Sequence, residues 1–394
     1  MVSTTEFDEL IEVLRDFIRR EVMPAEAGID ESDEIPGRLI AQAKEMGLYG
    51  YALPAEFGGL GLSVRQQVLV TMELGYTSPA FRSLFGTNNG IAGQVLVLAG
   101  TEEQRKHWLP RLASGEVVAS FALTEPDAGS DPSRLVTSAV PDPGPDPGPD
   151  PGPDLGPGGG WVIDGLKRYI TNAPAADIFM VFARTDPQAP PGKGIGVFIV
   201  PARLDGVAVA ARDHKMGQAG AWTADVSFSG ARVPADALVG EAAAAGYSTA
   251  MRSLAHGRLI IAALCAGVAA RLIDESVTYA RERSQGGHPI ADYQLIQAML
   301  ADSQTEYMAA RALVLDAAAR YDAGTDQRLA PSAAKYFASE AVGRIADRAV
   351  QIHGGSGYMR GVPVERLYRD VRLFRIYEGT SQIQQLVIAR EMLR

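Results

Sequence analysis

A glutamate near the C-terminal end of the sequence, Glu378, stands between an aromatic residue and a glycine. An amphipathic helix is predicted directly after it, with Thr380 or Ser381 capping the first amides. The predicted apolar face of that helix consists of Ile383, Leu386 and Val387. A carboxylate held at a helix start beside an apolar wall can act as a general base with a tuned pKa. Capping or solvation is the commoner role of such a glutamate, so its interpretation depends on the rest of the chain.

The elements that must position this carboxylate follow from the spacing of apolar residues. Residues 1–118 keep a 3.6-residue period and are predicted to be helical, with Gly47 ending one helix and Ser63 capping the next. Residues 119–233 contain short β-rich runs at 178–182, 196–200 and 226–228, which predict a β domain. Helical spacing returns over 234–394. The order helix, sheet, helix predicts an α+β protein of three domains.

Residues 141–160 fit none of these patterns. An Asp-Pro-Gly-Pro unit repeats from Asp142 onward and ends in three glycines. Proline removes hydrogen-bond donors and glycine adds chain entropy, so no packed element is expected. We expect a mobile surface insertion in the β domain.

Composition narrows the possible partners. The 394 residues carry a net charge of −10, which argues against nucleic acid or an anionic membrane as the main partner. No apolar run approaches the roughly 20 residues that span a bilayer, and the N-terminus does not resemble a signal peptide. Cys265 is the only cysteine and is expected to be a buried thiol, while the five scattered histidines give no support for a metal site. We expect a soluble protein of the cytoplasm, and abundant arginine, alanine and glycine suggest a bacterial source.

Several motifs together resemble the acyl-CoA dehydrogenase family. Tyr368-Arg369-Asp370 followed by residues 376–380 is similar to the C-terminal catalytic signature of that family. Six further segments match in order, at residues 53–59, 100–104, 123–131, 165–172, 215–218 and 351–358. The resemblance implies an N-terminal all-α domain (1–118), a middle β-barrel-like domain (119–233) and a C-terminal four-helix-bundle domain (234–394).

The resemblance implies a reaction as well as a fold. Glu378 occupies the position of the family's catalytic base, which removes the α-proton of an acyl-CoA thioester while the β-hydride passes to N5 of FAD. Tyr377 would supply an apolar wall, and Gly379 would let the thioester approach the backbone. The N–H of Glu378 would help to stabilise the enolate oxygen. Some members carry the base on a long helix, but that position here is Gly257, so Glu378 is the only candidate of the two.

The resemblance also implies a set of FAD-binding residues. Arg283 matches an arginine that reaches the pyrophosphate of FAD in a neighbouring subunit, and a guanidinium suits phosphate. Tyr169 stands where tryptophan is usual, and Gly286 replaces a phenylalanine, which departs from the family's packing. The predicted FAD contacts are Phe121, Leu123, Thr124, Ser130, Tyr169, Thr171, Arg283, Gln294, Gln351, Gly354, Gly355, Thr380 and Gln382.

A smaller set is predicted to contact the substrate. It consists of Ser130, Arg258, Tyr377 and Gly379, with Arg258 near the CoA moiety. Asn88 and Asn89 are either lining residues of the acyl channel or surface turn residues. His256 is expected to be a polar residue near a helix start that bonds to the local backbone.

Other functions stay open at this point. The acyl group could instead be carried on acyl carrier protein, in which case only the carrier of the thioester would differ. Ala219 departs from the family's pattern near the mouth of the pocket and leaves the choice of carrier open. A flavin monooxygenase or oxidase on the same fold would generally lack the glutamate, and a non-catalytic scaffold would have a degraded flavin site. The resemblance further implies an electron-transfer flavoprotein as acceptor, a homotetramer built as a dimer of dimers, and a place in fatty acid metabolism. Acyl chain length and branching are not fixed by the sequence.

Overall fold

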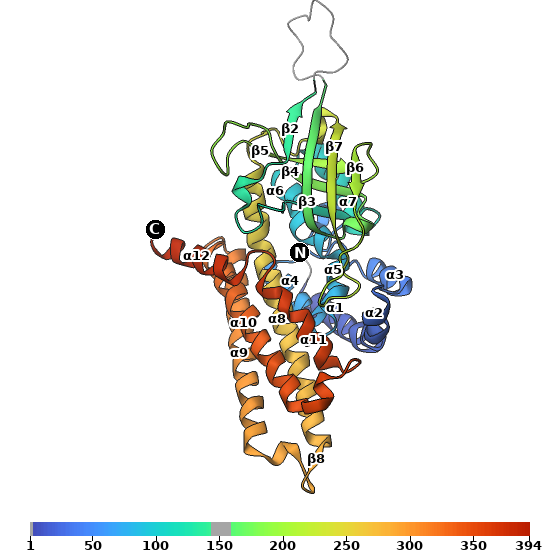
Figure 1. Ribbon diagram of the computed structural model, residues 1–394, viewed down its shortest axis with the longest axis vertical. Coiled ribbons are helices and arrows are strands. Elements are labelled where there is room, and N and C mark those ends of the chain that lie inside the picture. Colours follow the sequence, from blue (N-terminus) through green and yellow to red (C-terminus); the bar gives the residue numbers. More distant parts are fainter. Residues whose placement is uncertain (1–2, 143–158) are drawn as a thin grey trace, which may run out of the picture.

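The computed structural model describes residues 3–142 and 159–394 (Figure 1). The molecule is elongated, with a β-sheet at one end and long helices reaching to the other end (Figure 1). The predicted order of helical, sheet and helical regions is confirmed. The proposed insertion at 141–160 falls between two paired strands, and all but its first two and last two residues lie outside the described part.

The described N-terminal region contains seven α-helices, joined in part by short π and 3-10 segments. They are α1 (Thr4–Phe17), α2 (Glu26–Ser32), α3 (Gly37–Glu45), α4 (Val64–Leu74), α5 (Pro79–Asn89), α6 (Ile91–Ala99) and α7 (Glu102–Ser114). Among these helices, α1 to α3 lie beside the middle of the molecule and α6 and α7 lie at the sheet (Figure 1). The predicted cap at Ser63 is confirmed, since its hydroxyl accepts from the N–H of Gln66 at 3.2 Å. Asp322 caps the same helix from the C-terminal region, because its carboxylate accepts from the N–H groups of Val64 and Arg65 at 2.8 and 2.9 Å.

The middle region is a seven-stranded sheet in the order β1-β4-β2-β3-β7-β6, with β5 paired to β4. The strands are β1 (Ala119–Ala122), β2 (Ser138–Pro141), β3 (Trp161–Thr171), β4 (Ile178–Arg184), β5 (Ile195–Pro201), β6 (Val207–Val209) and β7 (Thr223–Val233). The three predicted β-rich runs lie in β4, β5 and β7. Phe179, Phe198 and Phe228 are buried in one cluster and hold the sheet together.

The C-terminal region is built around one long helix, α8 (Gly246–Glu282). The remaining elements are the hairpin β8 (Ser284–Gln285) and β9 (His288–Pro289) and the helices α9 (Gln294–Asp322), α10 (Leu329–His353), α11 (Pro363–Val371) and α12 (Ser381–Met392). An 18-residue window of α8 has a mean hydropathy of 1.6, which meets the requirement for a membrane span by length and composition. The sequence-based statement that no such run exists was therefore wrong. Because 89% of that window is buried inside the fold, α8 is a core helix.

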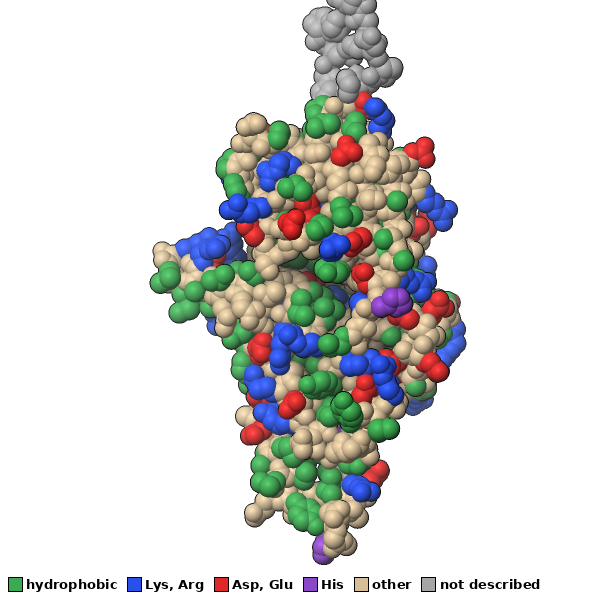
Figure 2. All heavy atoms as spheres, in the orientation of Figure 1, with side chains coloured by type: hydrophobic (Ala, Val, Ile, Leu, Met, Phe, Trp, Pro, Cys, Tyr) green, Lys and Arg blue, Asp and Glu red, His purple; other side chains and the backbone are tan. Residues whose placement is uncertain are grey.

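Two predictions about single elements had different outcomes. Cys265 is fully buried in the core of α8, as predicted, and burial raises the pKa of its thiol. The predicted apolar face of α12 was wrong, since Leu386 is exposed and the buried residues are Ser381 and Gln384. The physical reason is that α12 projects away from the body (Figure 1), and polar groups hold it to α10, with Ser381 donating to Glu340 and Gln385 donating to Tyr336. Charged side chains of both signs are mixed over the visible face (Figure 2).

Candidate active site

Glu378 lies in the short connection between α11 and α12, after the 3-10 turn Arg372–Arg375. Its backbone has φ of +53°, and that of Gly379 is +91°. Glycine adopts this left-handed region freely, whereas a residue with a side chain does so at a cost on the order of 1 kcal/mol or more. The chain then enters α12, which Thr380 caps by accepting from the N–H of Ile383 at 3.3 Å, as predicted.

The turn is held by bonds to its carbonyl groups. The side-chain amide of Gln384 donates to the carbonyls of Glu378 and Gly379 at 3.1 and 3.0 Å. The ammonium of Lys335 donates to the carbonyl of Gly379 at 2.8 Å. Within the described residues, the N–H of Glu378 donates to no acceptor. A fixed backbone donor therefore stands beside the carboxylate of the same residue.

The carboxylate of Glu378 lies directly against α8. A Cβ atom added to Gly257 would lie 2.2 Å from Oε2 of Glu378, so only glycine leaves room there. The residue as a whole is half-buried, but Oε2 has no contact with solvent and no hydrogen-bond partner. Glycine at position 257 therefore has two consequences. This position cannot supply a base, and the missing side chain creates the space that the carboxylate of Glu378 occupies.

The electrostatic surroundings of Glu378 act in opposite directions. Burial raises the pKa of its carboxyl group, and the positive charges of Arg82, Lys335 and Arg258 oppose this rise. Tyr377 forms part of the wall, as its ring stacks on Phe374 with centroids 6.0 Å apart. A carboxyl group with a raised pKa is suited to accept a proton near neutral pH.

Three buried cations surround this carboxylate, and the sequence reasoning named only one of them. Arg258 of α8 donates to the hydroxyl of Ser332 at 3.2 Å, and burial lowers the pKa of Lys335 of α10 to about 8. Arg82 of α5 is the third. The sequence does contain a signal for Arg82 and Lys335, because each is a cation within a helical run of apolar and small residues. A cation in such a run is rarely buried without a role.

The structure brings part of the predicted FAD set together at the rim of the sheet. The N–H of Arg168 donates to the carbonyl of Thr124 at 2.8 Å, which joins the end of β1 to β3. Tyr169 is 64% exposed beside this contact, and the carbonyl of Thr171 accepts from Ser120 at 2.8 Å. The side chains of Phe121 and Leu123 are buried in the core, which leaves only their backbone groups for the predicted contact with FAD. Ser130 and Gln382 are exposed, and Thr380 is half-buried.

A second part of the set lies at the far end of the long helices. Arg283 and Gln294 flank the β8–β9 hairpin at that tip (Figure 1). Gln351, Gly354 and Gly355 are close by at the end of α10, because Tyr279 of α8 stacks on His353 with centroids 4.2 Å apart. Within one chain, these five residues are separate from those at the sheet rim.

Both groups fit the chemistry of FAD. Tyr169 offers an exposed aromatic ring, and the guanidinium of Arg283 is exposed and donates to no described residue. A ring can cover a flat isoalloxazine, and a free planar fork of donors suits a pyrophosphate.

Three sequence-based interpretations need correction. Asn88 and Asn89 are neither channel nor surface residues, since both are buried and bond to backbone groups, for example from Asn88 to the carbonyl of Val117 at 2.8 Å. His256 lies about three turns inside α8, where its Nε2 is 2.7 Å from Oε1 of Gln67. Burial lowers the pKa of His256 to about 4. The side chains of Asn88, Asn89 and His256 are therefore buried and form hydrogen bonds inside the fold.

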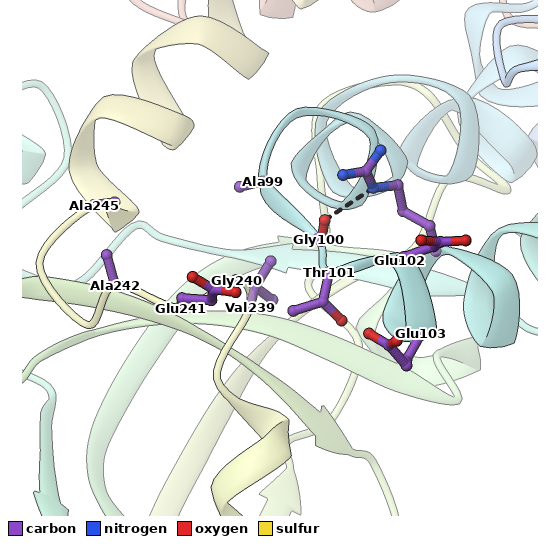
Figure 3. Close-up of a pocket in the computed structure, with 11 residues that line it drawn as sticks. Ala99, Gly100, Thr101, Glu102, Glu103, Val239, Gly240, Glu241, Ala242 and Ala245 are labelled. Carbon is purple, nitrogen blue, oxygen red and sulfur yellow. Dashed lines mark hydrogen bonds between the residues drawn. The ribbon is translucent and has the colours of Figure 1, made fainter.

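A surface hollow elsewhere contains none of the predicted site residues. It lies between the start of α7 and the segment before α8 and is lined on one side by Gly100, Thr101 and Glu103 (Figure 3). Gly240 and Glu241 form the other side. The candidate site at Glu378 rests on the geometry described above and not on this hollow.

Comparison with known proteins identifies the family of the chain. Profiles of the acyl-CoA dehydrogenase N-terminal, middle and C-terminal domains match residues 4–116, 120–231 and 244–393. The 3-(aryl)acrylate reductase of Clostridium sporogenes is 38% identical over 99% of both chains. A subunit of the caffeyl-CoA reductase–Etf complex of Acetobacterium woodii is 38% identical over 96% of both. The structure of butyryl-CoA dehydrogenase from Megasphaera elsdenii superimposes with a TM-score of 0.91 at 30% identity over 100% of both chains.

The motifs, the fold and these relatives agree over nearly the whole chain. The chain belongs to the acyl-CoA dehydrogenase family, FAD-dependent oxidoreductases that act on CH–CH groups.

Proposed function

We propose that the chain catalyses the α,β-dehydrogenation of an acyl-CoA thioester with Glu378 as the base. The observation that carries the proposal is the buried Oε2 of Glu378, which has no partner and lies beside the free N–H of the same residue. In the reaction the α C–H bond breaks and its proton passes to Glu378, while a hydride leaves the β-carbon and the C=C bond forms. Bound FAD supplies the acceptor for that hydride.

The other residues of the site have supporting roles. The N–H of Glu378 donates to the thioester oxygen as negative charge develops there. Gln384 and Lys335 keep this N–H in position, because they bond to the carbonyls of Glu378 and Gly379 and so fix the turn. Tyr377 and Gly379 exclude water and admit the flat thioester. Ser130 and Arg258 are the further substrate contacts that we propose.

The same site can also run in reverse. Two of the relatives are named as reductases of an arylacrylate and of caffeyl-CoA, both α,β-unsaturated compounds. By microscopic reversibility, Glu378 would then return the proton to the α-carbon. The direction depends on the reduction potential of the electron partner. The name of the caffeyl-CoA reductase–Etf complex supports an electron-transfer flavoprotein in that role.

The separation of the two FAD-binding groups supports an oligomer. The rim group of one chain and the tip group of a second chain would together hold one FAD, which favours a dimer or a dimer of dimers. The homotetramer, the cytoplasmic location and the place in fatty acid metabolism stay predictions from the resemblance.

Anaerobic bleaching of the flavin tests the proposed function. The FAD-loaded protein is mixed with thioesters of varied chain length, branching and charge, carried on CoA or on acyl carrier protein. We expect at least one CoA thioester to reduce the flavin with formation of its enoyl product. Reduction only by acyl carrier protein thioesters would show that acyl carrier protein, and not CoA, carries the acyl group. Reduction by no thioester on either carrier would overturn the dehydrogenase assignment.

A further inference from the structure

Arg82 differs from the other buried cations of the chain. Its side chain is buried, and its Nε has neither solvent contact nor a hydrogen-bond partner. Across residues 3–142 and 159–394, no hydrogen bond or ion pair joins its guanidinium to another group. Nη1 and Nη2 also lack partners but keep some contact with solvent, so this end of the guanidinium is open to a ligand. A buried side chain whose charge has no partner is unfavourable unless a ligand completes it.

The geometry of α5 and α6 places this guanidinium at the active site. The side chain of Arg82 runs along α5 over two glycines. A Cβ atom added to Gly86 would lie 2.7 Å from Nη1, and one added to Gly90 would lie 3.7 Å from Nη2. A side chain at position 86 would displace the guanidinium, so this glycine provides the space that Arg82 occupies.

The same junction contacts the base. Ile91 follows Gly90, and its Cγ2 would lie 3.1 Å from a Cβ atom added to Gly257. That added atom would also lie 2.2 Å from Oε2 of Glu378. The guanidinium of Arg82 and the carboxylate of Glu378 therefore border the same place, where α5, α6 and α8 meet.

The charges at this place do not balance. Glu378 faces three cations, of which Lys335 donates to the carbonyl of Gly379 and Arg258 to the hydroxyl of Ser332. One carboxylate can neutralise one cation. An acyl chain that is purely apolar would remove Arg82 further from water without giving it a partner. A carboxylate on the acyl chain would give it two parallel bonds, which a guanidinium forms better than any other side chain.

We propose that the substrate is a short dicarboxylic acyl thioester whose distal carboxylate binds Arg82. This inference rests on the proposed dehydrogenation at Glu378. The distal group reaches Arg82 only when few carbons separate it from the α-carbon, because both side chains border the same junction. Arg82 is therefore a specificity-determining residue for the acyl group.

The test compares matched pairs of thioesters. Flavin reduction is measured anaerobically with succinyl and glutaryl thioesters against butyryl and valeryl thioesters, on whichever carrier is active. We expect kcat/KM to favour the dicarboxylic member of each pair by at least about 100-fold, since a site built to bond a polar group discriminates strongly against an analogue without it. Arg82→Met removes this preference, and Arg82→Lys restores part of it. Arg320→Ala, which removes an exposed arginine of α9, is the matched control and keeps the preference.

A binding measurement separates recognition from an effect on the base. The affinity of non-oxidisable thioether analogues, with sulfur in place of the β-carbon, is read from the change in the flavin spectrum. We expect Arg82→Met to weaken the dicarboxylic analogue by a similar factor and to leave the monocarboxylic analogue unchanged. Equal loss with both analogues, or a wild-type preference for monocarboxylic thioesters, would overturn the inference and leave the dehydrogenase assignment intact. Reduction by no thioester would overturn both.

Discussion

Two buried groups of charges show how differently this fold treats structure and site. In the β region, the ammonium of Lys167 pairs with Glu125 at 2.8 Å and donates to the carbonyl of Phe182 at 2.7 Å. The carboxylate of Glu125 also accepts from the N–H groups of Val136 and Thr137 at 2.6 and 2.9 Å. Every charge in this group has its partners within the chain.

The second group, around Glu378, is incomplete. Oε2 of Glu378 and Nε of Arg82 both lack a partner, and three cations face one carboxylate. A complete group stabilises the fold, because removal of either member leaves a buried charge. An incomplete group is costly to the free protein and becomes complete only when a ligand binds. This difference separates a structural ion pair from a functional one more clearly than burial does.

The largest effect is expected from Glu378→Gln. The amide keeps the shape of the side chain but cannot accept the α-proton, so we expect flavin reduction to slow by about 10²–10⁴-fold. FAD content and melting temperature should stay the same or rise, since a buried charge without a partner has been removed. Stopped-flow absorbance and thermal unfolding measure both. Full activity of this variant would show that another group is the base.

Lys167→Met tests the complete group. It leaves Glu125 buried without its cation, so we expect the free energy of unfolding to fall by about 3–5 kcal/mol. Arg82→Met, the equivalent change in the incomplete group, should leave stability unchanged or increase it. Urea titrations of the two variants beside the parent protein decide the point. If both lose the same stability, the distinction between the two groups is wrong.

Gly257→Ala tests the space that the carboxylate needs. The new Cβ would lie 2.2 Å from Oε2 of Glu378, so the carboxylate must move. A displacement near 1 Å of a reacting group costs on the order of 100-fold in rate, and we expect flavin reduction to fall by about that much. Gly37→Ala is the control, because an added Cβ there meets no atom within 4 Å. Unchanged activity in Gly257→Ala would show that Glu378 acts from another position.

The smallest effect is expected in the pH profile. Since burial raises the pKa of Glu378 above its ordinary value of 4.5, the rate of flavin reduction should fall on acidification at a pH above that value, as the base becomes protonated. Arg82, Lys335 and Arg258 favour the ionised form, so Arg82→Met should move this limb to higher pH. Single-turnover rates measured across pH check the direction. A shift to lower pH would contradict the placement of Arg82 beside the base.

The sequence predicted more of the fold than of the site. Period and turn residues predicted the three regions, since helix and strand patterns depend on neighbouring residues, and the motifs identified Glu378. Arg82 was missed because its role depends on glycines four and eight residues later and on a contact with α8. His256 was misplaced because nothing local shows that Gln67, on another helix, accepts its bond. The apolar pattern of α12 was overridden because that helix leaves the body of the protein.

The left-handed backbone of Glu378 has a practical consequence for protein engineering. Glycine or asparagine would adopt φ of +53° at less cost and would add stability on the order of 1 kcal/mol. A library of variants that is ranked by melting temperature alone would therefore tend to replace this residue. Selection for a robust protein and selection for a working one would diverge at this single position, so any stabilisation campaign should hold Glu378 fixed.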